Sequence, residues 1–301
     1  MTFNIKKFLL DHTVPDRAAF FLPVYGIGDK LRFFSYLHLF EIFNDCPARV
    51  LVSSDFDNSL LTCFPELHSK SLQIPLSTAH LLYVNDRLMA DNVSLTPGPG
   101  LVFPTWHHHY LNGQGTRWEQ VNQQHVTHDL FVKQALHVPA IFSPSKLVLP
   151  RCNESIVKRD RILLAPFSVS TPATPLAIWL DLAARLSAVG FEVICNVGLG
   201  GRKPFYEQNY TELIERYESF EKPISELISL LNSFSGVVTT RTGLSDLLSL
   251  TNVPSVTLTP NSINRFWDIP NHGGRHIEIR CTPDMNMEII SQKTVQFILG
   301  A

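Results

Sequence analysis

The sequence predicts an α/β protein with two domains, each built on a parallel sheet that helices cover on both faces. Short apolar segments typical of buried strands alternate with longer segments that repeat apolar residues at helical spacing. This alternation runs twice, and a polar stretch with two prolines between residues 144 and 161 separates the two runs. A chain of 301 residues is long enough for two domains of ordinary size.

Composition narrows the class of protein. The 45% hydrophobic and 17% charged fractions are those of a folded globular chain, and a formal net charge of -2 gives no sign of a nucleic-acid-binding surface. The five cysteines are scattered without a CxxC pair, so neither a disulfide framework nor a zinc site is predicted. No signal peptide pattern and no apolar run of the ~20 residues that cross a bilayer is found. We therefore expect a cytoplasmic protein without a nucleic-acid partner.

The first run begins with an apolar strand over residues 18–24 and a glycine-containing turn over 25–29. Residues 30–43 carry a broad apolar face at helical spacing and predict one helix, after which 49–54 returns as a strand. Further short strands are expected at residues 80–85, 100–106 and 140–144.

The second run repeats the alternation more clearly. A strand over 161–166 is followed by a helix that starts at Pro175 and stops at Gly190. The expected core face of this helix is Leu176, Trp179, Ala183 and Leu186. The remaining elements expected are strands at 191–198, 236–240 and 254–260, and helices at 223–234, 243–251 and within 283–299.

Such alternation requires right-handed crossovers and parallel strands, which makes each domain Rossmann-like and doubly wound. We place the domains at residues 1–150 and 151–285, followed by a terminal helix at 286–301. Ligands of these sheets bind beyond the carboxyl ends of the strands. The loops at 168–174, 198–203 and 241–243 all follow predicted strands and are expected to face one cleft.

The loop formed by Arg241, Thr242 and Gly243 is suited to a phosphate. A helix that starts here exposes its first backbone N–H groups, which attract anions. Glycine permits close backbone approach, threonine caps or donates a hydrogen bond, and arginine offers a planar fork of donors. The alternative is that Arg241 forms a structural ion pair, with Asp246 as the candidate partner.

Three stretches carry a family likeness: the glycine-rich turn and helix at 26–40, the strand, loop and tryptophan-bearing helix at 162–198, and the strand, turn and helix within 223–260. In these stretches the chain resembles the GT-B glycosyltransferases, most closely the heptosyltransferase-like branch of bacterial surface polysaccharide synthesis. It departs from the family at 241–243, where Arg-Thr-Gly stands in place of the usual Asp-Ser-Gly.

The resemblance implies two Rossmann-like domains facing a cleft, with the acceptor on the first domain, the nucleotide sugar on the second, and the terminal helix packing back on the first. It also implies an inverting, metal-independent transfer to a glycan or lipid-linked acceptor of lipopolysaccharide or capsule. The nucleotide sugar is then a substrate and no cofactor is expected. Peripheral association with the inner face of the plasma membrane would bring the enzyme to its acceptor.

The resemblance assigns Asp29 as the general base, against the alternative that its carboxylate only caps the following helix. The donor-binding residues expected are Ser168, Ser170, Thr171, Arg202, Arg241, Thr242 and Gly243. The acceptor-binding residues expected are Gly26, Gly28, Trp106 and His108.

Two polar-aromatic stretches allow more than one interpretation. Residues 106–110 contain three consecutive histidines, but these point in different directions on a helix or strand, so no metal site is predicted. An acceptor loop and a loop packed between domains stay open for this stretch. In 264–278, His272, Arg275 and His276 rank below Arg241 as phosphate ligands.

Two other functions stay open. One is a catalytically silent GT-B-like module that binds a glycan or a partner, and the other is an NDP-sugar epimerase.

Overall fold

The computed structural model forms two compact units. One comprises Met1–Ser145 with Arg265–Asp268, and the other comprises Lys146–Asn264 with Ile269–Ala301. The structure describes residues 18–21, 27–52, 60–61, 63–73, 100–102, 127–136, 138–150, 160–168, 174–196, 203–222, 224–263, 265–270, 272, 275–282 and 285–300. The expected strand at 80–85 lies outside these residues.

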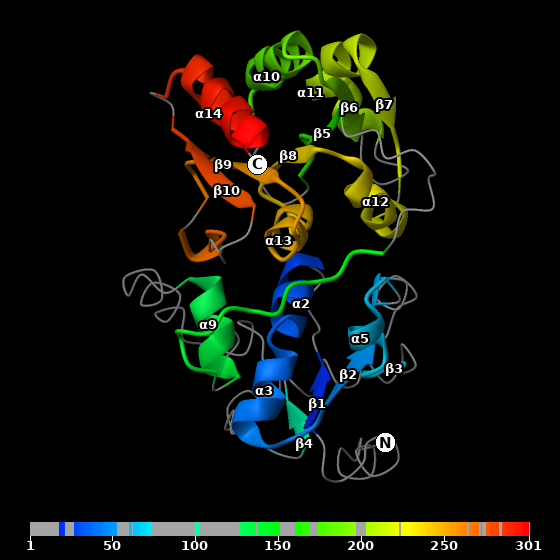
Figure 1. The fold of residues 1–301 in the computed structure, drawn as a ribbon, viewed down its shortest axis with the longest axis vertical. Helices are drawn as coiled ribbons and strands as arrows, with labels where there is room; N and C mark the ends of the chain where they lie inside the picture. Colours follow the sequence, from blue (N-terminus) through cyan, green and yellow to red (C-terminus); the bar gives the residue numbers. More distant parts are fainter. Residues whose placement is uncertain are drawn as a thin grey trace. The chain divides into compact units, whose positions relative to one another are not determined.

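The first unit holds a four-stranded sheet in the order β3-β2-β1-β4, and all its pairs are parallel. Its strands are β1 (Ala18–Phe21), β2 (Ala48–Val52), β3 (Ser71–Gln73) and β4 (Gly100–Val102). Its helices are α2 (Ile27–Phe34), α3 (Leu37–Asn44), α5 (Pro65–His68) and α9 (His128–Ala135), labelled in Figure 1. Strands are therefore present in each of the predicted stretches 18–24, 49–54 and 100–106, over parts of their length.

The single helix predicted over residues 30–43 is wrong, because the chain breaks between α2 and α3. The Tyr36 N–H donates to the carbonyl of Phe33 at 3.0 Å, which tightens the last turn of α2. The Ser35 hydroxyl donates to the carbonyl of Arg32 at 2.7 Å and competes with the helical ladder. The predicted apolar face is nevertheless buried in both helices, with Leu31, Phe34, Leu37 and Phe40 at most 4% exposed.

The strand predicted over residues 140–144 is also wrong. The Phe142 N–H donates to the carbonyl of Pro139 at 3.1 Å, which closes a β-turn at this point. Ile141 at the turn is 88% exposed. Apolar residues in this short run therefore do not mark a buried strand.

The second unit holds a six-stranded parallel sheet in the order β10-β9-β8-β5-β6-β7. The strands are β5 (Arg161–Ala165), β6 (Glu192–Asn196), β7 (Glu218–Phe220), β8 (Gly236–Thr240), β9 (Ser255–Pro260) and β10 (His276–Cys281). This is the Rossmann strand order, in which the order of successive strands reverses at the neighbouring pair β5 and β8 while all strands stay parallel. The prediction of an α/β protein with doubly wound, parallel sheets is confirmed.

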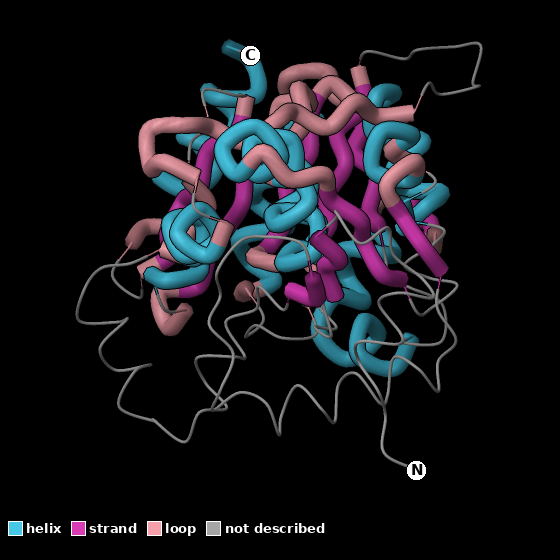
Figure 2. Tube along the Cα trace, turned by 90° about the horizontal axis from the view of Figure 1, so that it is seen from below, coloured by secondary structure: helices cyan, strands magenta, loops and turns pink. Residues whose placement is uncertain are grey.

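The helices of the second unit are α10 (Leu176–Ala188), α11 (Lys203–Arg216), α12 (Ile224–Leu230), α13 (Gly243–Ser249) and α14 (Met287–Gly300), with a short 3-10 helix at Leu231–Ser233. A second 3-10 helix, Arg265–Trp267, belongs to the first unit. Side chains of α10, α11 and α14 share one core cluster with the strands. Figure 1 shows α10 and α14 on one side of this sheet and α12 and α13 on the other. Figure 2 shows the strands in magenta with helices in cyan beside them.

The core face predicted for the helix at 175–190 is largely confirmed. Trp179, Ala183 and Leu186 are fully buried, whereas Leu176 is only partly buried against the same cluster. Ile178 and Leu182, which the spacing argument did not include, are also buried. Gly190 has a φ of +97°, a conformation that suits the glycine stop of the helix.

Three elements of the second unit, α11, β7 and β10, lie where the sequence predicted no helix or strand. The strand β10 overlaps the polar-aromatic stretch 264–278, and its alternating polar residues concealed an edge strand of the sheet. The helix predicted within residues 283–299 is present as α14, which packs on α10 and buries Ile290 and Ile298 in the core of the second unit. Among the described residues, no helix is both long and apolar enough to cross a membrane.

Candidate functional site

The candidate donor site starts where β5 and β8 lie side by side. These neighbouring strands pair in parallel from Ile162 with Gly236 to Ala165 with Thr239, and their connections leave in opposite directions. The hydroxyl of Thr239 donates to the carbonyl of Ala165 at 3.1 Å. This hydrogen bond joins the carboxyl ends of β5 and β8. In sheets of this order, ligands bind at this reversal point.

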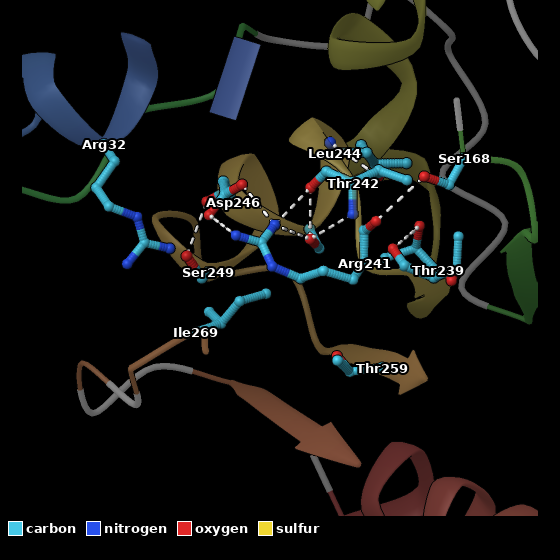
Figure 3. A network of polar contacts seen from close by, with 12 residues as sticks. Arg32, Ser168, Thr239, Arg241, Thr242, Leu244, Asp246, Ser249, Thr259 and Ile269 are labelled. Carbon is cyan, nitrogen blue, oxygen red and sulfur yellow. Dashed lines mark hydrogen bonds and ion pairs between the residues drawn. The ribbon is translucent and has the colours of Figure 1, made fainter. Parts of the chain in front are cut away.

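The turn after β8 is a well-formed helix start. Thr242 is the N-cap of α13, and its hydroxyl oxygen accepts a hydrogen bond from the Leu244 N–H at 3.2 Å. The Thr242 N–H donates to the Ser245 hydroxyl at 3.0 Å, which completes a capping box. Gly243 is the first residue of α13. The local sequence thus fixes the turn through its own hydroxyl groups, as Figure 3 shows.

Arg241 forms a bidentate ion pair with Asp246, the alternative left open by the sequence. Its two terminal nitrogens lie 2.6 and 3.1 Å from the two carboxylate oxygens, and the side chains are only 7% and 5% exposed. The guanidinium also donates to the Ser245 hydroxyl and the Thr242 carbonyl, both at 3.0 Å (Figure 3). In this structure the guanidinium charge is therefore compensated inside the turn.

Ser168 lies beside this turn, and the loop after β5 is tied to β8 at a second point. The Ser168 hydroxyl donates to the Arg241 carbonyl at 3.4 Å, and Ser168 is buried (Figure 3). Further along the loop, the hydroxyls of Thr174 and Thr240 are 3.3 Å apart, and Tyr210 donates to the Thr174 carbonyl at 3.0 Å. The structure thus brings Ser168 together with the turn formed by Arg241, Thr242 and Gly243. Ser170, Thr171 and Arg202 lie outside the described residues.

His276 does not lie at this edge of the sheet. It is the first residue of β10 and pairs with Ser255, the first residue of β9, so it belongs to the amino ends of the strands. Its Nδ1 is 2.9 Å from the Ser255 hydroxyl, and both residues are buried. The prediction that His276 ranks among the phosphate ligands is wrong, because ligands of such sheets bind at the opposite edge.

In the first unit, residues 27–29 of the predicted glycine-containing turn form the start of α2. The helix begins at Ile27, three residues earlier than the sequence suggested, and includes Gly28, which is buried, and Asp29. Asp29 is therefore inside the first turn and is not the residue that precedes the helix, although a carboxylate is favourable there as well. Gly26, Trp106 and His108 lie outside the described residues.

A buried polar cluster joins α2, the break after it and α9, and sequence reasoning missed it. Asp129 accepts a hydrogen bond from the Tyr36 hydroxyl at 2.6 Å and pairs with Lys133 at 3.0 Å. Arg32 lies 3.8 Å from the same carboxylate, and all four side chains are nine-tenths buried or nearly so. The spacing of Asp129 and Lys133, four residues apart, was the only signal in the sequence.

Burial changes the acidity of two tyrosines in these regions. Desolvation, followed by the nearby Asp129 carboxylate, raises the pKa of Tyr36 well above its usual value. Desolvation raises the pKa of Tyr210 to about 12. Both phenols therefore keep their protons at neutral pH and act as hydrogen-bond donors, Tyr36 to Asp129 and Tyr210 to the loop after β5.

Histidine, cysteine and acidic residues do not gather into a metal-binding group within the described part of the chain: no set of three or more lies close enough together. At the described turn after β8, the polar groups include the hydroxyls of Ser168 and Thr242 and the ion pair of Arg241 with Asp246.

No protein-family model matches the chain, and no curated protein matches it. Solved structures do. The ADP-heptose lipopolysaccharide heptosyltransferase II of E. coli has 13% identity and a TM-score of 0.61, over 94% of this chain and 99% of that one. A family 9 glycosyl transferase of Veillonella parvula has 11% identity and a TM-score of 0.62, over 96% and 99% of the chains. The E. coli heptosyltransferase WaaC with ADP has 11% identity and a TM-score of 0.57, over 93% and 99%.

These matches span nearly the whole of each protein, so the likeness extends to both units and not to a single Rossmann-like domain. Together with the strand order of the second sheet, they show that this chain has the heptosyltransferase-like GT-B fold of the glycosyltransferases.

Proposed function

We propose that this protein is an inverting, metal-independent glycosyltransferase that moves a sugar from a nucleotide-sugar donor to a glycan or lipid-linked acceptor of a bacterial surface polysaccharide. The observation that carries the proposal is the meeting of Ser168 with the turn at 241–243, at the point where β5 and β8 diverge. Nucleotides bind at this point in sheets of this order. The similar structure of WaaC holds ADP, which supports a nucleoside diphosphate as the leaving group.

On the donor side, the proposed ligands of the diphosphate are the hydroxyls of Ser168 and Thr242 and the backbone at Gly243. Donors fixed in place before the reaction stabilise the charge that develops on the leaving group, which is the role a metal ion has in other transferases. Arg241 holds the shape of this turn through its ion pair with Asp246. Ser170, Thr171 and Arg202 complete the proposed donor set, and no cofactor is invoked.

On the acceptor side, Asp29 is the proposed general base. It removes the proton of the acceptor hydroxyl while that oxygen attacks the anomeric carbon of the donor sugar. The bond between this carbon and the diphosphate oxygen breaks, and its electron pair leaves with the nucleoside diphosphate. A single displacement of this kind inverts the anomeric centre. Gly26, Gly28, Trp106 and His108 are the proposed acceptor contacts, and the enzyme is proposed to work in the cytoplasm.

A second candidate, a catalytically silent GT-B-like binding module, is favoured by one observation. The Arg241 guanidinium is already occupied by Asp246, whereas an arginine that neutralises a leaving diphosphate needs its donors for the phosphate. The two candidates differ in nucleotide turnover, which the experiment below measures separately from nucleotide binding.

The first measurement is a thermal-shift screen of the purified protein with ADP, UDP, GDP, CDP and CMP, since a ligand of the folded state raises its melting temperature. We expect one nucleotide to raise it, and the rise to shrink in Ser168→Ala. The matched control is Ser233→Ala, another buried serine of the second unit, whose hydroxyl donates to the Leu230 carbonyl. A screen in which no nucleotide raises the melting temperature contradicts the proposal.

Catalysis is tested by release of the nucleoside diphosphate from nucleotide sugars in the presence of bacterial surface glycolipid. We expect Asp29→Asn to keep the nucleotide-dependent thermal shift and to lose about two to four orders of magnitude in rate. Glu66→Gln, which changes an exposed acidic residue of the same unit, serves as the control. Binding without any release in the wild-type protein would favour the silent module.

A further inference from the structure

The first unit exposes four large apolar side chains on neighbouring segments. Ile42 and Phe43 at the end of α3 are 58% and 40% exposed, and Ile141 and Phe142 in the turn after α9 are 88% and 38% exposed. We call these four residues the apolar patch. Large apolar side chains at these exposures leave much of their surface in water, and contiguous apolar patches of this kind are often binding surfaces.

The two halves of the apolar patch are in contact. The rings of Phe43 and Phe142 pack edge to face with their centroids 4.8 Å apart. The Asn44 side-chain amide donates to the Leu136 carbonyl at 3.1 Å and joins the end of α3 to the end of α9. Figure 1 shows α3 in blue beside the green segment that follows α9. The patch is therefore one surface, although its halves are almost 100 residues apart in the sequence.

Two hydrogen bonds hold the turn that presents Ile141. Its closing hydrogen bond runs from the Phe142 N–H to the Pro139 carbonyl, and the Lys133 ammonium donates to the carbonyl of Ala140 at 3.1 Å. The middle of such a turn usually carries glycine, asparagine, aspartate or serine. Here it carries Ala140 and Ile141. The turn therefore exposes an isoleucine at a position where a polar residue is more common.

The size of the apolar patch argues against a second copy of the chain as its partner. From the exposed fractions and the typical area of large side chains, the patch offers roughly 400 Å². A stable protein interface needs about 800 Å² on each partner. A bilayer has no such requirement, because each inserted side chain gains free energy separately.

The charges on α3 and at its end do not suggest attraction to anionic lipid. Glu41 pairs with Lys70, Asp45 is exposed just after the helix, and His38 is exposed on it. Binding at this surface would therefore rest on insertion of apolar side chains, with little dependence on salt or on lipid charge.

We propose that the apolar patch is a membrane-docking surface, in which Ile141 and Ile42 insert into the interfacial layer of a bilayer and Phe43 and Phe142 support them. The inference rests on the proposed function, because a lipid-linked acceptor lies in a membrane. It names a surface by which the first unit, which carries Asp29, would be held at a membrane.

The test is flotation of the purified protein with phosphatidylcholine vesicles and, separately, with vesicles that contain phosphatidylglycerol, at low and high salt. The variants are Ile141→Asp, Ile42→Asp and the double variant. The matched control is Leu299→Asp, which removes an aliphatic side chain of 57% exposure in the second unit and adds the same charge. Melting temperatures confirm that each variant is folded.

We expect the wild-type protein and Leu299→Asp to float with both vesicles at both salt concentrations, and the double variant to lose about tenfold or more of its bound fraction. The proposal is overturned if the wild-type protein does not float, or if the double variant floats as well as the control. It is also overturned if the wild-type protein is a dimer that Ile141→Asp makes monomeric, since a second copy would then cover the patch.

Flotation needs no donor, so the two proposals fail separately. A protein that floats through the apolar patch but binds no nucleotide keeps this inference and refutes the transferase. A protein that binds a nucleotide but does not float with vesicles keeps the transferase proposal and refutes this inference.

Discussion

Arg241 and Asp246 are joined by two hydrogen bonds, of 2.6 and 3.1 Å, inside the turn that leads from β8 into α13. Both side chains are almost completely buried, so the two charges have been removed from water and depend on each other. The pair fixes the geometry of the turn at which we propose the donor diphosphate binds. Several consequences of this packing are measurable.

Breaking the pair is expected to be costly. Asp246→Asn leaves the guanidinium buried without its counter-charge, and we expect the free energy of unfolding to fall by about 3–5 kcal/mol. Urea denaturation measures this change. Asp181→Asn is the control, because Asp181 pairs with Arg185 on the surface of α10 and its loss should cost well under ~1 kcal/mol. Equal effects of the two variants would show that the buried pair is not a special part of the turn.

The cap of α13 should contribute a smaller amount. Thr242→Ala removes the hydroxyl that accepts from the Leu244 N–H, and we expect a loss of about 1 kcal/mol in denaturant unfolding. Thr242→Ser keeps an oxygen at the same place and should stay near the wild-type value. If the serine variant were as unstable as the alanine variant, packing of the threonine methyl group, and not the cap, would be responsible.

Packing between β8 and α14 can be tested at Gly236. A methyl group added there would lie 2.5 Å from the Cδ1 atom of Ile298, so Gly236→Ala should destabilise the protein by about 1–3 kcal/mol. Ile298→Val removes that Cδ1 atom. Gly236→Ala should therefore cost less in the Ile298→Val background, and a double-mutant cycle of unfolding free energies measures the coupling. Simple additivity would contradict the close contact between this strand and the terminal helix.

Tyr210 predicts a loss of stability in alkaline solution. Its pKa is 10.0 in an exposed tyrosine and burial raises it to about 12 in the folded protein. Below pH 10 both states keep the proton. Between pH 10 and 12 only the unfolded chain releases it, so the free energy of unfolding falls as the pH rises, by on the order of 2 kcal/mol.

The contribution of Tyr210 is the difference between the pH profiles of the wild-type protein and Tyr210→Phe, each measured by denaturant unfolding from pH 8 to 12. Tyr36, whose pKa is also raised, adds a loss of the same sign to both profiles and cancels in the difference. Parallel profiles would show that the Tyr210 phenol is not buried as the structure has it. At pH 8 the variant should lose about 1 kcal/mol with the bond to the Thr174 carbonyl.

Local patterns were enough where one segment explains itself. The helix at 176–188 follows from its apolar spacing, with Pro175 before it and Gly190 after it. The strand at 236–240, its polar turn and the helix from Gly243 follow from an apolar run next to Thr242, a residue suited to cap a helix. Patterns failed where a neighbour decides the outcome, as at β10, a polar edge strand that only its pairing with β9 reveals.

The sequence by itself determined the fold class, the order of most elements in the second unit and the position of the polar turn at 241–243, because these depend on spacing along the chain. Only the tertiary structure decided that Arg241 pairs with Asp246, that Asp129 collects Tyr36 and Lys133 in a buried cluster, and that Phe43 meets Phe142 on the surface. The physical reason is desolvation and contact. A side chain's charge, acidity and exposure depend on atoms that folding brings near it, and their identities are not encoded in the residues beside it.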